Sequence, residues 1–231
     1  QIVYYFFCYF QIIKNSEKIN FSVPTGNFGD IYSGYIAKKM GLPINKLVIA
    51  TNKNDILKRV ISTGHYKPLK VEHTVSPSMD IQVVSNFERL VFDINANDPL
   101  KTSKLMSDLI NQGAFELKKK ELNKIRENFC SESLSVKETK LVINEMYKKR
   151  GIFIDPHTAV GLGVAKKISL DGKTVVLATA HPSKFSDVIF EVTGVKPELP
   201  ENMKKILSEK ERYDKLPKIL KTVQNYIIDK V

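Results

Sequence analysis

The residues best placed for chemistry lie in residues 21–41, which read FSVPTGNFGDIYSGYIAKKMG. An apolar segment leads into a turn with two glycines, Gly26 and Gly29, and the turn leads into a helical pattern. Glycine permits positive φ and close approach of the backbone to a ligand. The start of a helix presents unpaired N–H groups and a partial positive charge. The stretch therefore predicts a phosphate site, with an ordinary strand-to-helix turn as the alternative.

Other patterns that carry chemistry are absent from the sequence. The glycine turn has neither a Walker lysine nor a G-x-G-x-x-G spacing, so it is not a P-loop or a dinucleotide fingerprint. The four histidines and two cysteines show no zinc spacing, so no metal site is expected. Cys8 and Cys130 are too few for a disulfide framework. They indicate free thiols in a reducing, cytoplasmic setting.

The net charge of +11 comes from 31 lysines and only five arginines, spread along the chain. Because arginine is the preferred residue for recognition of phosphates and guanine, this balance argues against a nucleic-acid partner. The longest apolar run covers residues 2–10. It is shorter than the roughly 20 residues of a membrane helix, so no membrane segment is expected.

Strand and helix patterns alternate along the chain and must position the glycine turn. This alternation predicts an α/β fold with a mostly parallel sheet flanked by helices. The aromatic-rich residues 2–13 favour a buried helix, although their periodicity does not exclude a strand. Strands are predicted at 19–23, 46–50, 152–154 and 174–178. Helices are predicted at 30–40, from residue 54 or 55 to 64, from residue 85 onward, at 155–167 and at 182–194. Capping boxes are predicted for Ser85 with Glu88 and for Ser135 with Glu138.

Composition divides the chain into three parts. Residues 1–97 and 151–195 carry the alternating α/β pattern. Residues 98–150 hold charged, amphipathic helical segments and predict a helical subdomain. Residues 196–231 are basic and predict C-terminal helices.

Six blocks of sequence resemble the threonine synthase family, in the longer form found in fungi and many bacteria. They are QIVYYFFCYF, PTGNFGD, GYIAKKMGLPINKLVIATNKNDIL, SPSMDIQVVSNFERLVF, DPHTAVG and LATAHPSKF, in the family's order across residues 1–190. The resemblance implies a fold-type-II enzyme that uses pyridoxal 5'-phosphate. Such an enzyme converts O-phosphohomoserine and water into threonine and phosphate, with the cofactor as electron sink.

The resemblance also implies roles for particular residues. The cofactor's phosphate loop matches Gly26, Asn27, Phe28, Gly29 and Asp30. Thr179 matches the neutral hydroxyl at the pyridine nitrogen, with a strand or capping role as its alternative. The substrate-binding residues match Ser85, Asn86, Arg89 and His157, of which Ser85 and His157 are also explained as helix-capping residues. A guanidinium such as that of Arg89 suits a dianionic substrate phosphate.

One departure from the family concerns the lysine that forms the internal aldimine. The family's Phe-Lys-Asp segment, upstream of the aromatic helix, does not occur in this sequence, which begins at Gln1. We therefore expect the C-terminal part of a longer cytoplasmic enzyme, inactive by itself, with a monomer and a dimer both left open. Two alternatives are another fold-type-II phospholyase acting on a phosphorylated amino alcohol and a non-catalytic homologue of the same fold.

Overall fold

The main sheet has four parallel strands in the order β5-β2-β1-β6. The structure is a computed structural model that describes residues 1–13, 15, 17–201, 203–204 and 209–230. The strands are β1 (Ile19–Pro24), β2 (Ile44–Thr51), β5 (Phe129–Ser133) and β6 (Thr174–Val176). β1 is buried along its whole length. Burial of both its apolar and its polar residues, Asn20 and Ser22 among them, is typical of a parallel strand covered on both faces.

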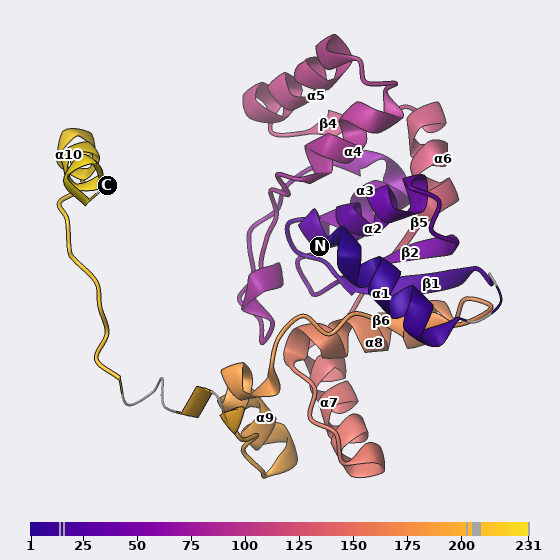
Figure 1. Cartoon of the computed structure of the whole chain (residues 1–231). Helices are drawn as coiled ribbons and strands as arrows, with labels where there is room; N and C mark the ends of the chain where they lie inside the picture. The colour runs from indigo at the N-terminus through magenta and orange to yellow at the C-terminus, as the bar shows by residue number, and fades with distance from the viewer. Residues whose placement is uncertain (14, 16, 202, 205–208, 231) are drawn as a thin grey trace. The chain divides into compact units, whose positions relative to one another are not determined.

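Helices cover both faces of the sheet (Figure 1). In β2, Leu47 and Ile49 join one core while Val48 and Ala50 join the other, because successive side chains of a strand point to opposite faces. The first core is completed by α1 (Ile2–Ile12), α2 (Gly29–Lys39), α3 (Ile56–Thr63), α4 (Phe87–Ile94), α5 (Pro99–Gln112) and α6 (Lys119–Asn128). The second is completed by α7 (Val136–Arg150), α8 (Pro156–Ile168) and α9 (Ser186–Thr193).

Short elements connect these layers. A two-residue antiparallel pair joins β3 (His65–Tyr66) to β4 (Phe115–Glu116), and the 3-10 turns are η1 (Pro77–Met79) and η2 (Pro182–Phe185). Residues 1–197 form one compact unit, and residues 198–231 form a second that contains α10 (Leu220–Lys230). None of the described helices is long and apolar enough to cross a membrane.

The predicted α/β class with a parallel sheet is confirmed, and residues 2–13 are helical rather than extended. The predicted capping box at α7 is present: the Ser135 hydroxyl accepts from the Glu138 N–H, and the Glu138 carboxylate accepts from the Ser135 N–H at 2.8 Å. The division of the chain at residues 98, 151 and 196 stays a prediction.

Three local predictions are wrong. Residues 98–150 are not only helical, because β5 pairs with β2 inside that stretch. The FCSES sequence of β5 is short and half polar, which hides it between two strong helix patterns. Residues 152–154 form no strand, since no described strand pairs with them. The capping box of Ser85 and Glu88 is absent: α4 begins at Phe87, and the Ser85 hydroxyl contacts Asn27 instead.

Candidate active site

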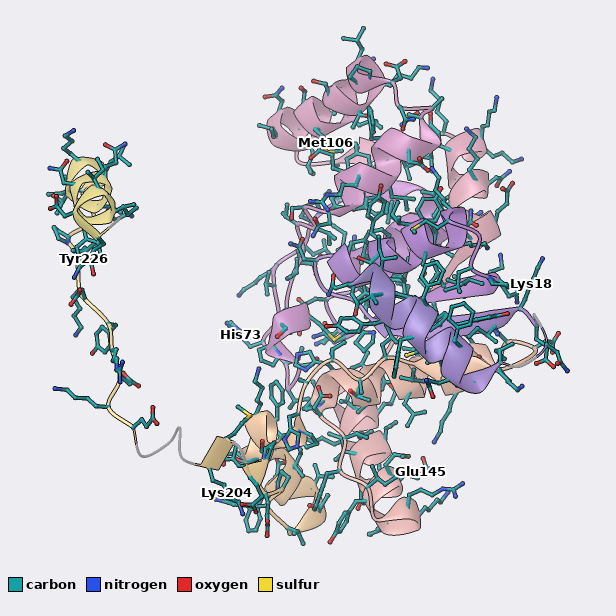
Figure 2. The ribbon with its side chains drawn as sticks, in the orientation of Figure 1. Lys18, His73, Met106, Glu145, Lys204 and Tyr226 are labelled. Atoms are coloured by element: carbon teal, nitrogen blue, oxygen red, sulfur yellow. The ribbon has the colours of Figure 1, made fainter. Side chains whose placement is uncertain are left out.

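The candidate site lies at the carboxyl edge of the sheet. β1 ends at Pro24 and its neighbour β6 ends at Val176. Because parallel strands point the same way, the segments that follow them meet at one edge, where ligands bind in open α/β sheets. Loop 24–29 and Thr179 therefore share this edge. Figure 2 shows Lys18, which precedes β1, at the opposite end of the strands from His73.

Loop 24–29 presents free backbone donors at the start of α2. The N–H groups of residues 26–31 donate none of the described hydrogen bonds. Phe28 caps the helix in the left-handed region, with φ of 66°, and its ring is 1% exposed. That ring packs against Phe87 and Phe129, with centroids 5.3 and 5.8 Å away. The core thus holds a turn with unpaired amides at the start of a helix, which is an arrangement suited to an anion.

The two glycines of the loop do not have the role that their conformational freedom predicts. Neither has positive φ, and the left-handed residue is Phe28 between them. At Gly26 a Cβ atom would lie 2.4 Å from the Ser78 carbonyl oxygen, so glycine is required there by packing. At Gly29 a Cβ atom would meet the Asn86 Nδ2 at 3.4 Å, which is an ordinary contact.

Asn27 joins the loop to the segment before α4. Its Oδ1 accepts from the Ser85 N–H at 2.8 Å and from the Ser85 hydroxyl at 2.9 Å. The Asn86 Nδ2 donates to the Asn27 carbonyl at 2.8 Å. Because a backbone N–H is only a donor, the amide oxygen of Asn27 must face Ser85. The Asn27 Nδ2 makes none of the described hydrogen bonds, so it remains a donor for a ligand.

Arg89 borders a cavity of about 800 Å³ between α2, α4 and α5. The Arg89 side chain is exposed and makes no described ion pair. Ser85 and Asn86 line the same cavity, so its wall continues into loop 24–29. The structure therefore brings the predicted Ser85, Asn86 and Arg89 together with the phosphate loop. The remaining lining residues are Tyr32, Glu88, Phe92, Pro99, Thr102, Ser103, Met106, Ser107 and Ile110; Figure 2 labels Met106 on α5.

Asp30 has a structural partner that sequence reasoning missed. The fully buried Tyr5 of α1 donates to the Asp30 carbonyl at 2.8 Å, and its hydroxyl lies 3.2 Å from the Asp30 Oδ1. Burial raises the pKa of the Asp30 carboxyl, although the hydrogen bond from Tyr5 opposes that shift. The side chain of Asp30 thus ties the start of α2 to α1. No local sequence signal reports this contact, because 25 residues separate the pair.

His157 lies apart from the Arg89 cavity, in the first turn of α8. Its Nδ1 lies 2.9 Å from the Asp155 carboxylate, and its ring centroid lies 4.9 Å from that of Phe185. The His157 Nε2 is buried and has no partner among the described residues. Burial acts to raise the pKa of Asp155, but hydrogen bonds from His157 and Thr158 outweigh it and hold that pKa below its usual range.

Thr179 follows β6 and is exposed, with no described hydrogen bond. Leu177, two residues earlier, still donates to the Ser22 carbonyl of β1 at 3.0 Å. His181 caps η2 by accepting from the Ser183 N–H at 3.2 Å. Thr179 therefore lies two residues beyond the last described bond to β1 and makes no described hydrogen bond to loop 24–29.

Known proteins match this chain by sequence and by fold. The family described as "Threonine synthase, C-terminal" matches residues 158–227. Threonine synthase of Pseudomonas aeruginosa is 39% identical over 98% of the chain and 49% of its own length. A crystal structure of pyridoxal-phosphate-bound threonine synthase from Brucella melitensis has a TM-score of 0.92 and 43% identity, over 98% of this chain and 49% of that one. The yeast enzyme's structure has a TM-score of 0.88 and 37% identity, over 99% and 50%.

The sheet, the loop at its carboxyl edge and these structural matches define a fold-type-II pyridoxal-phosphate architecture. Within that class the chain belongs to the threonine synthase family. The chain spans about half the length of the curated relatives it matches.

The residues present fit the phosphate group of pyridoxal phosphate. The unpaired amides at the start of α2 supply neutral donors to an anion, and the Asn27 Nδ2 adds another. The described chain places no carboxylate among those donors, because the Asp30 side chain is turned toward Tyr5. At the ring end, Thr179 offers a hydroxyl with no described partner.

Proposed function

We propose that the intact protein is a threonine synthase, which converts O-phosphohomoserine and water into threonine and phosphate with pyridoxal phosphate as cofactor. The observation that carries this proposal is the joining of two anion-binding features. The unpaired amides of residues 26–31 are linked through Asn27 to Ser85 and Asn86, which line the cavity of Arg89. The reaction requires two phosphates to be held at once, one on the cofactor and one on the substrate.

Each feature then has one task. The amides of residues 26–30 would hold the cofactor's phosphate, and the Thr179 hydroxyl would be the neutral partner of its pyridine nitrogen. Arg89, with Ser85 and Asn86, holds the substrate's phosphate in the cavity. When bound, the cofactor supplies an electron sink for removal of the substrate's protons. His157 contributes to substrate binding through Nε2, because the Asp155 carboxylate orients its ring through Nδ1.

The lysine that would bind the cofactor covalently lies outside these 231 residues in this proposal. Two lysines near the carboxyl edge, Lys53 and Lys58, are paired with Glu72 and Glu132. Those pairs support the view that neither is the missing group. The chain by itself is then inactive, and threonine formation by the isolated 231 residues would contradict this part. A cytoplasmic location stays a prediction of the sequence.

The proposal is tested on the polypeptide as it is naturally produced. Pyridoxal phosphate is added, the sample is reduced with borohydride, and the labelled lysine is located by peptide mass spectrometry. A label outside residues 1–231, with threonine as product, supports the proposal. A label within them contradicts the lysine assignment. A ketone product identifies a phospholyase instead, and the absence of any label identifies a non-catalytic homologue.

The role of Arg89 has its own test. Arg89→Gln should lower kcat/KM for O-phosphohomoserine by roughly 10- to 100-fold, since a hydrogen bond to a charged group is lost. Arg150→Gln, at the exposed end of α7, is the matched control and should leave kcat/KM unchanged. Equal effects of the two changes would remove Arg89 from the site.

A further inference from the structure

The segment between β3 and α4, residues 67–86, is irregular apart from η1. Such a segment has few backbone hydrogen bonds of its own, so side chains must fix its course. The polar side chains that do so gather at the carboxyl end of β2, just after Thr51. Asn52 and Asn54 are 2% and 3% exposed there, and a buried amide requires hydrogen-bond partners.

Asp80 is the common partner of these groups. Its Oδ1 accepts from the Asn52 Nδ2 at 2.8 Å, the Asn54 Nδ2 at 3.0 Å and the Thr74 hydroxyl at 2.7 Å. Its Oδ2 accepts from the Thr74 N–H at 2.8 Å. In the described part of the chain no cation lies within ion-pair distance of Asp80. Neutral donors therefore satisfy this carboxylate, and they tie the segment to the end of β2.

The same segment forms the wall behind the phosphate loop. The Ser78 carbonyl and the Met79 Cα lie 2.4 and 3.2 Å from the position of a Cβ atom at Gly26, so the two backbones are in close contact. Ser78 is two residues from Asp80. A shift of this segment would move the backbone against which Gly26 packs, and the loop amides would move with it.

We propose that Asp80 is a positioning residue for the phosphate loop, acting through Ser78 and Met79 on Gly26. The inference rests on the proposed function, in that the loop is taken to hold the cofactor's phosphate. Asp80 itself touches neither cofactor nor substrate. Its effect is confined to the phosphate end of the cofactor, because its network reaches loop 24–29 at Gly26 and does not include Thr179.

The test compares pyridoxal phosphate with pyridoxal, which lacks the phosphate, by equilibrium dialysis against the natural polypeptide. Asp80→Asn keeps the shape of the side chain but replaces an acceptor with a donor. It should lower the affinity for pyridoxal phosphate about tenfold and leave that for pyridoxal unchanged, so the ratio of the two affinities falls about tenfold. A general loss of stability would lower both affinities together.

Glu72→Gln is the matched control, because Glu72 lies in the same segment, loses the same charge, and among the described residues its carboxylate pairs with the exposed Lys53 alone. It should leave the ratio unchanged. If Asp80→Asn fails to fold, Thr74→Val removes one donor to Asp80 while keeping the side-chain shape, and it should lower the ratio too. An unchanged ratio in the folded variant overturns the role of Asp80. A wild-type protein that binds both compounds equally overturns the proposed function of the loop instead.

Discussion

Two connections leave neighbouring strands at the same edge of the sheet, and they are held very differently. Loop 24–29, after β1, is fixed on three sides: Asn27 bonds to Ser85, Gly26 packs on Ser78, and Asp30 is bonded by Tyr5. The connection from β6 to η2, residues 177–181, has exposed residues at 178 and 179 with no described hydrogen bond. On one side it is anchored by the Leu177 N–H, which donates to the Ser22 carbonyl at 3.0 Å, and on the other by the contact of Phe185 with His157.

The difference shows which part of the candidate site this chain builds by itself. The phosphate end is complete in its contacts, because α1, η1 and α4 all bear on one short loop. At the proposed ring end, the Thr179 side chain makes no hydrogen bond among the described residues. A substitution at a tightly packed position of loop 24–29, such as Gly26, should therefore affect both the fold and the ligand, whereas substitutions after β6 should affect the ligand alone.

The largest effect is expected from Gly26→Ala. The added methyl group would overlap the Ser78 carbonyl oxygen at 2.4 Å, so one of the two backbones must move. Such overpacking costs about 1–3 kcal/mol of unfolding free energy. Displacement of the loop should also abolish pyridoxal phosphate binding. Urea denaturation and equilibrium dialysis measure the two effects.

Gly29→Ala is the control for this change, since its methyl group makes an ordinary contact with Asn86. It should preserve stability and lower only the affinity for the phosphate that lies against the loop. A Gly26→Ala variant as stable as the wild type would show that the packing of Gly26 against the Ser78 backbone does not hold the loop in place.

An intermediate effect is expected from Asp155→Asn. Asp155 holds His157, whose ring contacts Phe185 beyond the connection after β6. The pKa of Asp155 is lowered in the folded state, so its contribution is fully present above its unfolded pKa of about 3.9 and is lost as pH falls through the lower folded value. The variant should lose about 1 kcal/mol of unfolding free energy at pH 7. Its stability should also fall less than that of the wild type on acidification.

Urea denaturation at neutral and acidic pH gives both quantities. Asp187→Asn, an acid in the first turn of α9, is the matched control and should keep the wild-type slope with pH. A wild-type slope in Asp155→Asn as well would show that the carboxylate does not stabilise the start of α8.

The smallest effect is expected from Thr179→Val. The side chain is exposed and without described partners, so the unfolding free energy should change by less than about 0.5 kcal/mol. The absorbance spectrum of bound pyridoxal phosphate should shift, since the ring nitrogen loses its hydroxyl partner. Thr179→Ser should keep the wild-type spectrum. Identical spectra for all three proteins would remove Thr179 from the ring end.

Local patterns in the sequence predicted most of the fold. The apolar strands β1 and β2, the helix after the glycine turn and the capping box of Ser135 are all encoded by neighbouring residues. The strand β5 was missed because its pairing with β2 joins residues about 80 positions apart, as in Val48 with Cys130. No periodicity within FCSES reports that pairing.

The candidate site divides in the same way. The glycine turn before a helix follows from local spacing, and the resemblance supplied the residues near Arg89. The contacts that hold the loop could not be predicted, because Tyr5 with Asp30 and Asn27 with Ser85 are 25 and 58 residues apart. Ser85, predicted to form a capping box with Glu88, bonds to Asn27 instead.

Phe28 belongs to both the loop and the core, and this has a consequence for how a ligand arrives. Its ring is held between Phe87 and Phe129, so the left-handed turn is a property of the folded core and exists before any phosphate is bound. A ligand then has little conformational entropy to remove from the loop, and association should proceed at the rate of encounter. A smaller side chain at Phe129 should loosen the packing of Phe28, so that the turn must form before the ligand can bind. The association rate constant should then fall, although Phe129 does not belong to the loop.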